Sequence, residues 1–89
     1  MERRLVLHIS QQIWAKFDGY RLRNQINDAF LQKEKAEKPI AASVIKSLTG
    51  QSIIVTTMPD YTADFLIKKR QVWEESFSLY LKSMEKSVE

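Results

Sequence analysis

Few side chains of this sequence could act as a nucleophile or as an acid and base. His8 is the only imidazole and there is no cysteine, so a thiol nucleophile, a disulfide and a thiolate zinc site are excluded. None of the serines stands in the sequence pattern of a nucleophile elbow. We therefore expect no catalytic residues and a protein that is not an enzyme.

Acidic pairs are the remaining candidates for metal chemistry. Glu34 with Glu37, and Glu74 with Glu75, are more typical of charges on a helix surface than of metal ligands. Gly50 is not followed by further glycines at the spacing of a phosphate-binding loop, so a hairpin turn explains it better. We expect neither a metal site nor a cofactor.

Basic residues point to one further kind of chemistry, the binding of phosphate. Fourteen Lys and Arg against eleven Asp and Glu give a net charge of +3 and a pI near 9.3. This mild excess is compatible with nucleic acid and also with any solvated surface. Binding through phosphates would be weakly sequence-selective and strongly salt-dependent. The candidate nucleic-acid-binding residues are Arg3, Arg4, His8, Arg21, Arg23, Lys46 and Lys68.

The residue pattern predicts the elements that would carry these side chains in the first half of the chain. From Arg4 to Ser10 apolar residues recur at every second position, which predicts a strand with His8 on its polar face. Three large apolar residues, Ile13, Trp14 and Phe17, then predict a structured loop or a single helical turn before Asp18-Gly19. From Tyr20 to about Lys35 apolar residues fall at helical spacing, and Asp18 can cap that helix.

The second half of the chain predicts a hairpin and a long helix. Strands over Ile40–Leu48 and Gln51–Thr57 flank a tight turn at Thr49-Gly50. In the first of these strands we expect Ile45 to point inward and Lys46 outward. Thr62 can cap a helix of about seven turns, whose apolar stripe reaches Val88. A short final strand over Phe77–Leu81 is the competing interpretation.

The order strand, helix, strand, strand, helix, with a possible short final strand, implies one domain over residues 1–89. We expect an α+β two-layer sandwich with two helices on one face of the sheet, the RNA-recognition-motif-like or ferredoxin-like arrangement. Its open sheet face is the platform on which such folds bind RNA or single-stranded nucleic acid. The central-strand segment Ser52–Thr57 has no aromatic residue for base stacking, and each missing stack removes about 1–3 kcal/mol.

A second class of function depends on the C-terminal helix. A helix seven turns long would extend beyond a small sheet, so part of its apolar stripe would be uncovered. The candidate protein-interaction residues are Tyr80, Leu81, Met84 and Val88. The alternative function is therefore a protein-interaction module that forms a homodimer or binds a host protein. Trp14, Trp73, Phe65 and Phe30 are better explained as core.

Apolar runs are too short for a membrane helix, and no signal-peptide block follows the first residues. We expect no membrane contact and a cytoplasmic or nuclear location.

The segment Gln51–Thr57, followed by Tyr61–Leu66 and then Trp73, carries a family resemblance. It resembles the gag-like first-reading-frame proteins of fungal LINE-type retrotransposons and the related EKA family of powdery mildew. The likeness extends more loosely over Arg4 to Phe77. It implies a divergent recognition-motif domain that coats element RNA. The residues that carry it are mainly structural, so they bear on fold more than on activity.

The chain departs from that family in two respects. It has no cysteine, and hence no zinc knuckle, and we expect it to stop after the second helix, where the family would add a fourth strand and more chain. The resemblance then implies a truncated or co-opted fragment. An EKA-like protein would act as an intracellular effector delivered into a host cell, with a host protein or host RNA as partner.

Overall fold

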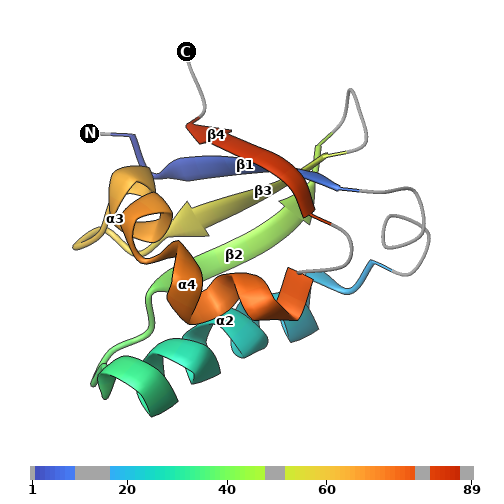
Figure 1. Ribbon diagram of the computed structural model, residues 1–89. Helices are drawn as coiled ribbons and strands as arrows, with labels where there is room; N and C mark the ends of the chain where they lie inside the picture. Colours follow the sequence, from blue (N-terminus) through green and yellow to red (C-terminus); the bar gives the residue numbers. More distant parts are fainter. Residues whose placement is uncertain (1, 10–16, 48–51, 78–80, 87–89) are drawn as a thin grey trace.

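The computed structural model describes residues 2–9, 17–47, 52–77 and 81–86. In chain order its elements are the strand β1 (Arg4–Ile9), the helix α2 (Gly19–Glu34), the strands β2 (Ala41–Lys46) and β3 (Ser52–Thr57), the helices α3 (Ala63–Lys68) and α4 (Arg70–Trp73), the 3-10 turn η1 (Glu74–Phe77) and the strand β4 (Leu81–Lys86). The strands form one antiparallel sheet in the order β2-β3-β1-β4, and the helices lie together on one side of it (Figure 1). The described residues thus form a small α+β domain.

The core lies between the sheet and the helices. Its sheet side consists of alternate residues of the two central strands, all fully buried: Leu5, Leu7, Ile53 and Val55. The helices contribute Leu22, Ile26, Phe30, Leu66 and Trp73. The Trp73 indole donates to the Leu66 carbonyl oxygen at 2.9 Å, which satisfies its only polar atom inside the core. The prediction that Phe30 and Trp73 are core residues is confirmed.

Both predicted helix caps are present. The Asp18 side chain accepts from the backbone N–H of Arg21 at 3.1 Å, and the Thr62 hydroxyl accepts from that of Phe65 at 3.2 Å. Each cap satisfies an N–H that the first helical turn would otherwise leave unpaired. Helix α2 ends at Glu34 and is capped by Lys35, which adopts the left-handed conformation with φ 54.

Helix α2 runs against the outer edge of β2 and covers it. The Asn27 amide accepts from the N–H groups of Ile40 and Ala41 at 2.9 and 2.8 Å and donates to the Ala41 carbonyl at 3.1 Å. At the start of the helix, a Cβ on Gly19 would meet the Val44 carbonyl oxygen at 2.1 Å, so only glycine permits this close approach. An edge strand with unpaired backbone groups is a site of unwanted pairing, and α2 blocks it here.

The predicted orientation of β2 is wrong. Val44 points inward and is 5% exposed, whereas Ile45 is 53% exposed on the opposite face. The reason lies in the pairing, since Val44 is opposite the buried Val55 and Ile45 is opposite Ile54. Both alternations of β2 contain one large aliphatic residue, so the pattern alone did not decide between them. Lys46 is opposite the buried Ile53, on the side of the sheet that the helices cover, although its own side chain is exposed.

The predicted seven-turn C-terminal helix is also wrong. The helical stretch breaks at Lys69, and after η1 the chain forms β4, which pairs antiparallel with β1. Without β4, one edge of β1 would have unpaired backbone N–H and C=O groups. The hydrogen bonds to β1 therefore favour a strand in this last segment, although the spacing of its apolar residues also fits a helix. The competing prediction of a final strand had the right type but lay too early in the chain. The predicted loop at Ile13 and Trp14 and the turn at Thr49-Gly50 lie outside the described residues.

Candidate nucleic-acid interface

The sheet face turned away from the helices is the first surface to consider. Because Leu5 and Leu7 point into the core, their neighbours Arg4, Val6 and His8 point to the other face. Cross-strand pairing adds Thr56, Ile54 and Ser52 from β3, and Ser43 and Ile45 from β2. We call this set of eight residues the open face. Among the described residues, no helix covers it.

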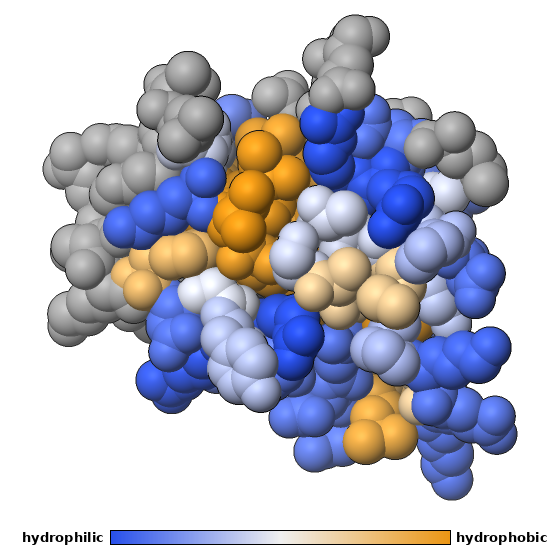
Figure 2. All heavy atoms as spheres, turned by 180° about the vertical axis from the view of Figure 1, so that it is seen from behind, coloured by the Kyte–Doolittle hydropathy of each residue, from blue (hydrophilic) through white to orange (hydrophobic). Residues whose placement is uncertain are grey.

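An apolar band crosses the middle of the open face. Val6 is paired with Ile54, and Ile54 with Ile45, so the three side chains form a row across β1, β3 and β2. Figure 2 shows an orange apolar band between blue polar side chains on the side of the molecule away from the viewer of Figure 1. Among the described side chains of this face His8 is the only ring. The band is therefore aliphatic, and base stacking on it would be weak.

Arg4 and His8 flank this band on β1, as the sequence predicts for His8. The Arg4 guanidinium pairs with the Glu2 carboxylate at 3.3 Å, and its side chain is 35% exposed. Glu2 also accepts from the backbone N–H of Arg4 at 2.9 Å, and this hydrogen bond is the main cause that holds the pKa of the Glu2 carboxyl below its ordinary value. Arg4, a cation of the open face, thus has an acidic neighbour in Glu2.

Arg3 has a structural role instead. Its guanidinium donates to the carbonyl oxygen of Thr57 through Nε at 3.1 Å and through Nη2 at 2.6 Å. These bonds join the chain just before β1 to the end of β3. Arg3 is therefore tied to the backbone and is not part of the open face.

Three of the predicted basic residues gather at the start of α2. Arg23 lies over the Tyr20 ring with its guanidinium carbon 4.8 Å from the ring centre, and Lys46 Nζ lies 5.5 Å from the centre of the Phe17 ring. Arg21 is exposed next to Tyr20. We call these five residues the cation–aromatic cluster. Cation–π contacts of this kind contribute about 0.5–1 kcal/mol each at exposed sites.

A hollow of about 220 Å³ opens beside the cluster. It is lined by Gly19, Tyr20 and Arg23 from α2 and by Ala42, Ser43 and Val44 from β2. The Nε atom of Arg23 is buried and has no hydrogen-bond partner among the described residues. A buried donor without an acceptor costs about 1–3 kcal/mol. Ser43 lines the hollow and also belongs to the open face, so the two surfaces are continuous.

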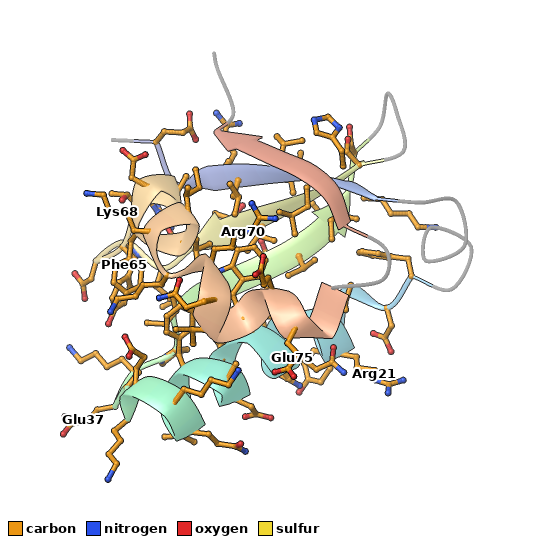
Figure 3. The ribbon with its side chains drawn as sticks, viewed as in Figure 1. Arg21, Glu37, Phe65, Lys68, Arg70 and Glu75 are labelled. Carbon is orange, nitrogen blue, oxygen red and sulfur yellow. The ribbon has the colours of Figure 1, made fainter. Side chains whose placement is uncertain are left out.

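Lys68 lies apart from both surfaces. It is exposed on α3, and Figure 3 shows it at the opposite end of the molecule from Arg21. Neighbouring cations are already paired, Lys69 with Glu34 at 2.6 Å and Arg70 with Glu74. The predicted nucleic-acid-binding residues therefore do not form one surface. Two lie on the open face, three at the start of α2, and Arg3 and Lys68 elsewhere.

A second hollow, of about 340 Å³, lies between α2 and α4. Lys33 in its wall donates to the Val72 carbonyl at 3.1 Å and pairs with Glu75 at 3.3 Å.

In the part of the chain that the structure describes, no three His, Cys, Asp or Glu side chains are grouped so as to hold a metal ion. Nor is any described helix long and apolar enough to cross a membrane.

The predicted protein-interaction residues do not form a helical stripe. Leu81 and Met84 belong to β4 and are paired with Ile9 and Leu7 of β1. Tyr80 and Val88 lie outside the described residues. The helical overhang on which that prediction depended is replaced by a strand of the sheet.

Sequence reasoning missed the aromatic part of the cluster. The pattern predicts that Tyr20 begins a helix and that Phe17 is an apolar residue of the preceding loop or turn, and it indicates a binding role for neither. The spacing of Tyr20 and Arg23, three residues apart on a helix, is a signal that could have found their contact. No such signal exists for Phe17 and Lys46, which the fold brings together from distant segments.

Comparisons of the chain with protein-family models, with curated proteins and with solved structures gave no match.

Proposed function

We propose that this protein is a non-enzymatic domain that binds RNA or other single-stranded nucleic acid across its open face. The observation that carries the proposal is the uncovered face of the central strands, where Arg4 and His8 flank the apolar band. We further propose that the domain is of the RNA-recognition-motif type. The strand order β2-β3-β1-β4 and the alternation of strands and helices support this assignment.

The chemistry of the face favours a particular mode of binding. Arg4 can pair with phosphates, and His8 can stack on a base or donate to a phosphate. Val6, Ile54 and Ile45 offer an apolar floor for bases and riboses. With few cations and no Phe, Tyr or Trp among the described side chains of the face, we expect micromolar affinity and little sequence selectivity.

The family resemblance is consistent with this proposal. A gag-like protein of a LINE-type element would bind the element's RNA through a divergent recognition-motif domain. The protein-interaction alternative loses its original basis, because the apolar C-terminal helix is replaced by β4.

The test is a fluorescence-anisotropy titration of a labelled single-stranded RNA at about 20, 50 and 150 mM salt. Affinity should fall with salt, and Arg4→Gln should reduce the log–log slope by about 0.7, the contribution of one phosphate contact on a single strand.

Two apolar residues of similar exposure provide a matched pair of variants on different elements. Ile45 is 53% exposed on the open face, and Leu31 is 56% exposed on α2. Ile45→Glu should weaken RNA binding about fivefold or more at low salt, because it places a negative charge beside the phosphates. Leu31→Glu makes the same change away from the face and should have little effect.

Equal effects of the two variants, or no RNA binding at low salt, would contradict the proposal. Light scattering on the same samples tests the other explanation, which is that the open face binds a second copy of the protein. A dimer that Ile45→Glu dissociates would assign the open face to self-association.

A further inference from the structure

The cation–aromatic cluster is not needed for binding across the open face, yet its composition suits the same ligand. Tyr20 is 70% exposed, so most of its aromatic ring is accessible to a ligand. One face of the ring lies against the guanidinium of Arg23. The opposite face is the one on which a flat ligand can stack.

Arg23, which lines the hollow beside Tyr20, has a buried hydrogen-bond donor without a partner among the described residues. Arg23 Nη2 donates to the Asn24 side chain at 2.9 Å, but the buried Nε has no acceptor among the described residues. The hollow, at about 220 Å³, is smaller than the pockets that hold drug-sized molecules, so a single small group fits it best.

We propose that the cluster is a second contact point for a single nucleic-acid strand, where one base stacks on Tyr20 and adjacent phosphates pair with Arg21 and Arg23. This inference rests on the proposed function and adds a binding site to it. Stacking on an exposed ring with a cation beside it is the mode by which proteins bind single strands without reading sequence, because every base has a π face.

The position of the cluster gives the path of the strand. Ser43 lies on the open face, paired with Thr56, and also lines the hollow next to Tyr20. Neighbouring strands are about 4.8 Å apart, so β1 and β2 are separated by about 10 Å. A strand that leaves Arg4 and crosses β3 and β2 therefore arrives at the hollow within a few nucleotides. The aliphatic band would guide the strand, and Tyr20 would supply the aromatic stack that the face lacks.

The test compares two probes of equal length and charge. One is a fluorescein-labelled 12-nucleotide oligouridylate, and the other is a 12-unit abasic chain with the same phosphates. Tyr20→Leu should weaken oligouridylate binding about fivefold or more and leave the abasic chain unaffected, since only the stack is lost. Tyr20→Phe keeps the ring and should bind like the wild type.

Two further variants act as controls. Arg21→Gln should weaken both probes and reduce the salt slope by about 0.7. Leu31→Ala removes an exposed apolar side chain from the same helix, about three turns away, and should change neither probe. Circular dichroism of each variant confirms that the fold is retained.

The outcomes separate the two proposals. If Tyr20→Leu binds oligouridylate like the wild type while Ile45→Glu weakens it, the second contact point is refuted and the open face stands. If Tyr20→Leu weakens both probes equally, no base stacks there and the inference is refuted. If the wild type binds neither probe at low salt, both proposals fail together.

Discussion

Asn27 joins helix α2 to the sheet with a single side chain. It makes three hydrogen bonds to the backbone of Ile40 and Ala41, and both of these residues are 1% exposed. Truncation would leave two buried N–H groups and one carbonyl without partners. Since each such group costs about 1–3 kcal/mol, Asn27→Ala should lower the free energy of unfolding by about 3 kcal/mol.

Urea denaturation measures this loss. Asp28→Ala, at an exposed neighbouring position, is the control and should stay within about 0.5 kcal/mol of the wild type. Asn27→Asp keeps the oxygen acceptors but not the donor to Ala41, so its cost should be intermediate. A loss below about 1 kcal/mol for Asn27→Ala would show that water replaces these bonds and that Asn27 does not fix the start of β2.

Glu2 gives the stability of the domain a defined dependence on acid. Hydrogen bonds from Arg4, above all from its backbone N–H, hold the pKa of the Glu2 carboxyl below its ordinary value of 4.5. A carboxyl whose pKa is lower in the folded state stabilises that state above its unfolded pKa, and the contribution is lost as pH falls through the folded pKa. Glu2→Gln should therefore be less stable than the wild type at pH 7, with the difference closing in acid below the ordinary value.

Unfolding curves at neutral and acidic pH measure this closing difference. Glu37→Gln, a change of the same kind at an exposed site near the end of α2, provides the comparison. A gap between Glu2→Gln and the wild type that stays constant with pH would contradict the role given to the ionised carboxylate.

At the scale of elements, the sequence predicted the helix caps and the types of the first strand, the helix α2 and the hairpin strands. These features depend on local signals, the Asp18 and Thr62 side chains and the alternation of Leu5 with Leu7. The orientation of β2 and the nature of the last segment depend on pairing partners. Ile45 and Val44 are equally suited to face inward, and the pairing of Val44 with the buried Val55 decides between them. The spacing of Leu81 and Met84 fits either a helix or a strand, and the pairing of this segment with β1 decides for the strand.

The end of α2 allows a stabilising change. Lys35 has φ 54, the only positive φ of a residue other than glycine in the described part of the chain. A side chain in this conformation is strained by its Cβ, whereas glycine adopts it without cost. Lys35→Gly should therefore raise the free energy of unfolding by about 0.5–1 kcal/mol, measured by urea or thermal denaturation.

Lys38→Gly tests whether this gain comes from the backbone conformation. Lys38 is also an exposed lysine near the end of α2, but it lacks the positive φ. Its replacement should be neutral or slightly destabilising, because glycine gives the unfolded chain more freedom. A destabilised Lys35→Gly variant would mean that the lysine side chain contributes more than its strain removes.

At the scale of the whole molecule, the charges are spread rather than concentrated. Arg3 is used to join two strands, Lys68 lies at the far end, and the remaining predicted residues divide between the open face and the start of α2. The sequence indicated which residues are basic and that one sheet face is open. It did not show which cations share a surface, because that depends on the edge contact between α2 and β2 that Gly19 and Asn27 establish.

The most direct test of the central claim is an NMR titration of the ¹⁵N-labelled protein with a single-stranded RNA at low salt, followed through the backbone amide signals. The account predicts the largest shifts at open-face residues of β1, β3 and β2, among them Val6, His8 and Ile54, with small shifts along α3 and α4. Shifts confined to the helices, or none at saturating RNA, would contradict nucleic-acid binding across the open face.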